Sequence, residues 1–128
     1  MQASSAQRRE FFRLHFNAPL QFAVSRSPSS KAVSKNISSS GILFQTQTAP
    51  PQLSSIVWMN VDIRTLKICR EIEQRALIFN NGLLGRVVRV EEDPDKGAYD
   101  VGVCFLTQDQ KNSREIQQIL ADLSKKTA

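Results

Sequence analysis

The sequence predicts a mainly β protein, a small antiparallel β-barrel followed by one C-terminal α-helix. Most of the chain consists of short segments in which apolar and polar residues alternate, which is the period of a strand with one buried face. Clusters of Gly, Pro, Asn and Ser between these segments are typical of turns. Only the final segment, 107–125, changes to the helical spacing of apolar residues. Several short strands followed by one helix favour a barrel that the helix partly covers.

Length and composition indicate one folded domain over residues 1–128. Apolar residues make up 41% of the chain and charged residues 23%, which is not the profile of a disordered tail. No apolar run is long enough to cross a bilayer, and the first residues lack the apolar block of a signal peptide. We therefore expect a cytoplasmic protein with no membrane insertion.

The first half of the chain predicts a hairpin and a tight turn. Phe12–Val24 is predicted as a strand because its even positions are almost all large and apolar. Residues 25–30 have the composition of a turn, and Lys31–Ile37 is expected to return antiparallel to the first strand. The small polar residues of Asn36–Gly41 predict a tight turn, after which Ile42–Gln45 is extended again.

The second half predicts another hairpin. Ile56–Ile63 is expected to be a strand with its odd positions buried. Residues 64–82 fit neither period, so two short strands and a helical turn both stay open. Gly85–Val90 and Tyr99–Leu106 are predicted as paired strands, joined by a turn over 91–97.

The segment 107–125 predicts an amphipathic helix whose start is capped by Asn112 or Thr107. Its apolar face consists of Ile116, Ile119, Leu120 and Leu123. Trp58 falls on the outer face of its strand, where two interpretations stay open. It packs under a covering helix, or it marks a surface for a partner.

Positive charge is concentrated in the N-terminal third of the chain. Residues 1–41 hold six basic residues and one acidic residue, which accounts for the whole net charge of +5. Within this third, Arg9 and Arg13 form an RxxxR motif at the start of the first strand. Arginine forms paired hydrogen bonds with phosphate and with the O6 and N7 atoms of guanine. This part of the chain is therefore expected to bind an anionic partner, and its arginines are able to recognise a guanine nucleotide.

The predicted turn supplies a second set of candidate binding residues, and the first hairpin brings it to the same end as the arginines. Asn36 offers donors and acceptors to a base edge, and Ser38 offers a hydroxyl group. Gly41 permits a positive φ and a close approach of the backbone.

Together, R9EFFR13 and N36ISSSG41 resemble the RxxxR and [D/N]xSxxG motifs of the PilZ domain family. GRVVRV at 85–90 and VGVCF at 101–105 are similar to that family's later hairpin. The resemblance implies a PilZ-type β-barrel and a bacterial receptor for the second messenger cyclic di-GMP. By this resemblance, both arginines and all three turn residues contact the ligand.

The resemblance also implies finer details. In the family, an arginine directly before RxxxR accompanies capture of two intercalated ligand molecules, and Arg8 stands there. Arg89, which follows Gly85 and Val87 in the later strand, is expected to flank the ligand. We expect residues 1–13 to form a ligand-binding arm that becomes ordered on binding and relays messenger levels to an unidentified downstream protein.

Other classes of function were weighed from the same residues. The basic third also suits a small barrel that binds nucleic acid, but such a barrel normally exposes several aromatic residues, so no nucleic-acid partner is expected. A PilZ-fold adaptor without ligand binding is the other alternative. His15, the single histidine, has no nucleophile or acid at a catalytic spacing, and the acidic residues of 91–95 lack a calcium-loop pattern. No catalytic residue, cofactor or metal is therefore expected.

Overall fold

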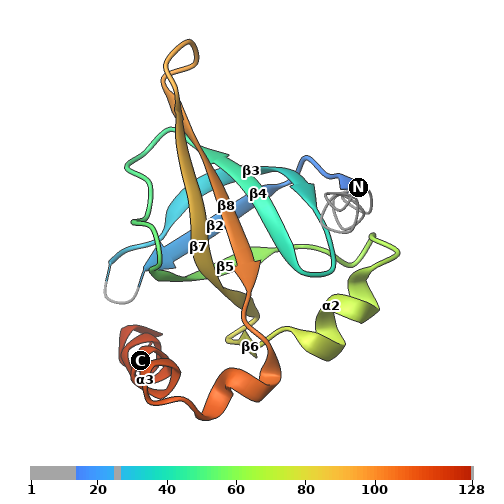
Figure 1. Cartoon of the computed structure of the whole chain (residues 1–128), viewed down its shortest axis with the longest axis vertical. Helices are drawn as coiled ribbons and strands as arrows, with labels where there is room; N and C mark the ends of the chain where they lie inside the picture. The colour runs from blue at the N-terminus through green and yellow to red at the C-terminus, as the bar shows by residue number, and fades with distance from the viewer. Residues whose placement is uncertain (1–13, 25–26, 128) are drawn as a thin grey trace, which may run out of the picture.

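The computed structural model describes residues 14–24 and 27–127, with side chains described up to 124. Its strands form one antiparallel sheet in the order β1-β3-β2-β5-β7-β8-β4, and β6 pairs with β7. An additional pairing of β3 with β4 closes six of these strands into a barrel (Figure 1). The strands are β1 Leu14–His15, β2 Pro19–Val24, β3 Ser30–Ile37, β4 Gly41–Thr46, β5 Ile56–Val61, β6 Ile78–Phe79, β7 Gly82–Asp93 and β8 Ala98–Phe105. The helices are α2 Cys69–Arg75, the 3-10 helix η1 Gln108–Asn112 and α3 Arg114–Thr127.

The inside of the barrel is filled by the residues that alternation places on one face of each strand. Val57 and Met59 of β5 are completely buried, as predicted, and Ile63 is buried just beyond the end of that strand. Phe22 of β2 and Phe44 of β4 face each other with ring centroids 5.0 Å apart. Burying side chains of this size contributes about 1.5 to 3 kcal/mol each, so this core is the main source of stability.

The prediction of one continuous strand over Phe12–Val24 is wrong, because residues 16–18 separate β1 from β2. The cause is Ser34 of β3, which is fully buried. Its hydroxyl group donates to the carbonyl of Phe16 and accepts from the amide of Ala18 at 2.9 Å. Hydrogen bonds to the side chain of Ser34 thus replace the regular backbone hydrogen bonds between the strands at this point, and the chain bends before entering β2.

The segment 64–82, left open by its sequence, contains both a helix and a strand. The helix α2 has seven residues, and β6 has two, so neither is long enough to show a clear period. Ile72 is the buried residue of α2 and attaches that helix to the main core. Burial raises the pKa of the Cys69 thiol at the start of the same helix.

The second hairpin is longer than predicted. β7 continues through Glu91 and Glu92 to Asp93, so the expectation of a turn beginning at 91 is wrong. The turn lies at 94–97 and ends at Gly97, whose φ of 61° favours glycine. Figure 1 shows this hairpin extending past the rest of the barrel. Its acidic residues are tolerated in strands because the projecting part is exposed to solvent.

The predicted helical segment 107–125 consists of η1 followed by α3. Thr107 begins η1, where its amide donates to Gln110 at 2.7 Å. Ser113, rather than Asn112 or Thr107, caps α3, because its hydroxyl group accepts from the amide of Ile116 at 3.2 Å. This correction arises because Thr107 caps the 3-10 helix and Asn112 lies within it.

Helix α3 covers the outer side of β5 and β7 through a second apolar cluster. That cluster contains Ile56, Leu77, Leu84, Leu106, Ile116 and Leu123. Trp58 packs against it and donates from Nε1 to the carbonyl of Phe79 at 2.8 Å. The packing interpretation of Trp58 is therefore confirmed. At the edge, Arg86 contacts Glu115 at 2.8 Å, and this hydrogen bond lowers the pKa of the Glu115 carboxyl group.

Candidate ligand-binding groove

A row of four residues crosses the outer face of the barrel, away from α3. Asn36 of β3 pairs with Leu43 of β4, which pairs with Gly102 of β8. Gly102 in turn pairs with Arg89 of β7. Because neighbouring strands lie about 4.8 Å apart, the two polar ends of the row are separated by about 14 Å. We call the hollow along this row the groove; it has a volume of about 250 Å³ and is lined by Asn36, Leu43, Val88, Arg89, Gly102, Val103 and Cys104.

Both polar ends of the row follow a β-bulge. In β3 the register shifts between Ser34 and Asn36, and in β7 it shifts between Val87 and Arg89. Ser34 and Val87 point into the core, with exposures of 0% and 1%. In a regular strand, residues two positions further on would point inward as well. The extra residue in each strand therefore turns Asn36 and Arg89 outward, on the same face of the barrel.

The floor of the groove is low because one of its residues has no side chain. A Cβ atom added to Gly102 would lie 3.2 Å from the Cβ of Arg89, so even a small side chain would crowd the groove. Leu43 is half-buried beside it and presents an apolar surface. A glycine inside a strand often marks close approach of a ligand, and this was the one signal in the sequence for the floor.

The predicted turn forms one border of this face, and its residues hold its shape. Ser38 is 5% exposed, and its hydroxyl group accepts from the amide of Ser40 at 3.2 Å. The amide of Ser38 donates to the carbonyl of Gly41 at 2.8 Å. A Cβ atom on Gly41 would collide with the carbonyl oxygen of Val103. Close approach of the neighbouring strand therefore requires this glycine, whereas the predicted approach was that of a ligand. The expected positive φ is wrong because, among the described glycines, only Gly97 has one.

The predicted arginines of the arm, Arg8, Arg9 and Arg13, lie outside the described residues. The point at which the chain enters the barrel is described. Leu14 pairs with Ile37, and His15 pairs with Asn36. Strand β1 therefore joins the sheet directly beside the Asn36 end of the row. The structure thus brings Asn36 and Arg89 to one groove and attaches the preceding segment at one end of it.

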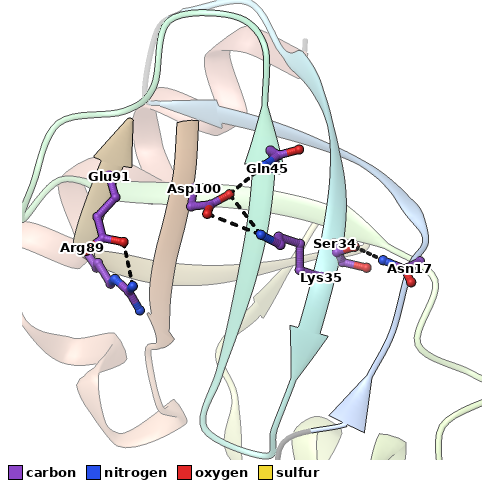
Figure 2. A network of polar contacts seen from close by, with 7 residues as sticks. All are labelled: Asn17, Ser34, Lys35, Gln45, Arg89, Glu91 and Asp100. Carbon is purple, nitrogen blue, oxygen red and sulfur yellow. Dashed lines mark hydrogen bonds and ion pairs between the residues drawn. The ribbon is translucent and has the colours of Figure 1, made fainter. Parts of the chain in front are cut away.

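A polar network lies along one side of the groove (Figure 2). The ammonium of Lys35 is 3.3 Å from Oδ2 of Asp100. The other carboxylate oxygen of Asp100, Oδ1, accepts from the side-chain amide of Gln45 at 2.8 Å. The guanidinium of Arg89 donates to Glu91 at 2.6 Å. These contacts connect β3, β4 and β8 on the outer face and orient the polar side chains next to the groove.

The arrangement of polar ends and an apolar floor is suited to binding a ligand. Asn36 and Arg89 supply hydrogen-bond donors at the two ends, and the apolar floor between them suits a flat ring. The sequence did not indicate Leu43, Val88 and Cys104 as lining residues, because outward strand positions look alike until the strands are placed in register. Gly102 was not predicted to line the site either, although a glycine inside a strand is a signal that could have indicated it.

A larger hollow of about 430 Å³ lies near α2, β5 and β6. Its charged residues include Asp62 and Arg64, which already form two hydrogen bonds with each other at 2.9 and 2.8 Å. These bonds lower the pKa of Asp62 to about 2. Asp62 and Arg64 are occupied by each other, and none of the predicted site residues that the structure describes lines this hollow. The smaller groove is therefore the better candidate site.

The strands form a small closed β-barrel with a groove on its outer face. The sequence model of the PilZ domain matches residues 7–122, and the chain belongs to the PilZ domain family. PilZ domains are ligand-binding or adaptor domains. No curated protein matches this chain.

The solved structures that are similar to the chain include two PilZ-domain proteins. The Bacillus subtilis inhibitor of motility (MotI/DgrA) aligns with a TM-score of 0.55 and 15% identity, over 91% of this chain. The chain spans 50% of that protein, so the likeness concerns the fold of one part of it. The PilZ domain of YcgR from Escherichia coli, solved with c-di-GMP, aligns with a TM-score of 0.47 and 12% identity, over 88% of this chain and 85% of that one.

Among the described residues, none of the helices is sufficiently long and apolar to span a membrane.

Proposed function

We propose that this protein is a receptor for cyclic di-GMP and that the ligand binds in the groove. The observation that carries the proposal is the row of paired residues from His15 and Asn36 across the barrel to Arg89. It joins three parts of the chain that family resemblance assigns to the ligand: the entry of the arm, the polar turn and the later hairpin. Membership in the PilZ family supports the choice of ligand.

The chemistry of the ligand matches that of the proposed site. Cyclic di-GMP carries two phosphate charges and two guanine rings. Arg9 and Arg13 of the arm bind phosphates and guanine edges, while Asn36 and Arg89 bind from the barrel. Ser38 and Gly41 contribute by shaping the turn against which the ligand lies. Each charged hydrogen bond contributes about 1.5 to 3 kcal/mol, and after the cost of association this corresponds to about micromolar affinity.

The arm carries the proposed signal. Arg8 adds a third guanidinium to the arm, and with it the site takes two intercalated ligand molecules. Ligand binding orders residues 1–13 against the groove, and the changed surface is recognised by a downstream protein. The positive charge of the N-terminal third favours rapid capture of the anionic ligand.

Isothermal titration with cyclic di-GMP tests this proposal. We expect two ligands per chain, no comparable binding of cyclic di-AMP or GTP, and a loss of tenfold or more in Arg9→Ala and Arg13→Ala. Arg70→Ala is the matched control, because Arg70 is exposed on α2 and its loss changes the net charge equally. No heat up to high micromolar ligand would refute the receptor function and leave the adaptor.

Ordering of the arm is tested separately by amide hydrogen exchange. Saturation with ligand should slow exchange in residues 1–13, while the amides of β5, already in the barrel, should change little. Unchanged exchange in the arm, in a protein that binds the ligand, would contradict the ordering step without affecting the binding site.

A further inference from the structure

The cation at the β7 end of the groove has an anionic partner within its own strand. Nη2 of Arg89 donates to Oε1 of Glu91 at 2.6 Å, within the same strand (Figure 2). Both residues point to the outer face, because they are two positions apart after the bulge. Their side chains are 56% and 57% exposed, so the ion pair lies in solvent and can be exchanged for another anion.

Glu91 also belongs to an acidic edge beside the groove. It pairs directly with Asp100 of β8, which pairs with Gln45 of β4. Like charges that face each other across strands repel. Lys35 and Gln45 compensate Asp100, and Arg89 compensates Glu91. This second row lies two residues along the strands from the row that forms the groove.

An anionic ligand in the groove therefore meets two opposing effects. At Nη2 of Arg89, its phosphate competes with the carboxylate of Glu91 for the guanidinium. Once replaced, that carboxylate is left facing Asp100 without its compensating cation, and it lies close to the phosphate. Both effects weaken binding of the ligand, and both disappear when the negative charge of Glu91 is removed.

We propose that Glu91 is a positioning residue that competes with the ligand phosphate for Arg89 and thereby sets the ligand concentration at which the receptor responds. This inference rests on the proposed function. Glu91 does not contact the bound ligand; it acts through Arg89. Removing its charge tightens binding, whereas loss of a true contact residue weakens it.

The test compares Glu91→Gln with Glu92→Gln by titration with cyclic di-GMP. Glu92 is the matched control, because it loses the same charge from the next residue, which pairs with Tyr99 and points to the opposite face of the hairpin. We expect Glu91→Gln to bind about fivefold more tightly than the wild type, which corresponds to about 1 kcal/mol. Glu92→Gln should bind as the wild type does.

A double-mutant cycle separates competition for Arg89 from general repulsion. In an Arg89→Ala background, the gain from Glu91→Gln should fall to less than half of its value in the wild type. Equal affinities for Glu91→Gln and Glu92→Gln, weaker binding by Glu91→Gln, or an undiminished gain without Arg89 would each overturn the inference while the receptor function stands. Failure of the wild type itself to bind would overturn the proposed function and this inference with it.

Discussion

The outer face of the barrel has two regions that differ in what covers them, and strand β7 runs through both. Under α3, the outward residue Leu84 is fully buried. At the groove, the outward residue Val88 is 54% exposed, next to the exposed Arg89. The same strand thus serves packing in its first half and the candidate site in its second half. Coverage by a helix, rather than the strand itself, decides which role an outward residue has.

The charged residues of the two regions show the same contrast. Arg86, beside α3, is bound both to Glu115 at 2.8 Å and to the carbonyl of Ser54 at 2.8 Å, so its contacts connect the helix to the barrel. Arg89, three residues further on, is bound within its own strand to Glu91. An arginine that connects two elements contributes to the fold, whereas the ion pair of Arg89 with Glu91 connects no second element.

The largest expected effect comes from breaking the covered region. Leu84→Ala removes a completely buried side chain beneath α3 and should lower the free energy of unfolding by about 3 kcal/mol, because it leaves a cavity. Urea denaturation measures this loss. Ligand affinity of the folded protein should stay within about twofold of the wild type. A large loss of affinity without a loss of stability would mean that the two regions are not separate.

A smaller effect on stability, but a large one on binding, is expected from filling the open region. Gly102→Val places a branched side chain on the floor of the groove and should reduce affinity for cyclic di-GMP by about tenfold or more. Stability should change by about 1 kcal/mol or less, because a β-branched residue suits a strand. Gly102→Ala, with one added carbon, should lose less. Wild-type affinity in Gly102→Val would show that the ligand binds elsewhere.

The smallest effect concerns the exposed ion pair at the edge of the covered region. The hydrogen bond from Arg86 lowers the pKa of Glu115, so the pair stabilises the fold above the ordinary pKa of glutamate and is lost as the pH falls through the lowered value. Glu115→Gln should therefore cost about 0.5 kcal/mol at pH 7 and nothing at an acidic pH at which Glu115 is protonated. Denaturation at the two pH values measures the difference. An equal cost at both would point to packing rather than charge.

The strands were predictable wherever alternation was regular. The inward positions of β5 and the antiparallel return of β3 followed directly from the period of two. The break between β1 and β2 did not, because it depends on the hydroxyl group of Ser34, sixteen residues further along the chain. The two elements within 64–82 were too short for any periodic signal. In each failure, a distant contact or a short length outweighed the local pattern.

The candidate site divides in the same way. The resemblance of the motifs indicated Asn36, Ser38, Gly41 and Arg89, and the structure places Asn36 and Arg89 along one groove. It also shows that Ser38 and Gly41 hold the turn, with the hydroxyl group of Ser38 already bonded inside it. The roles of all these residues toward a ligand stay predictions, as do those of the arginines at 8, 9 and 13.

The sequence by itself determined the fold class, the residues that fill the barrel and the position of the binding motifs, because these depend on local periodicity and on residue chemistry. Only the tertiary structure decided which outward residues lie together. Asn36 and Arg89 are neighbours across a groove because two bulges turn them outward and the register of four strands aligns them. Register is a property of strands brought together in space, so no single segment of the chain contains it.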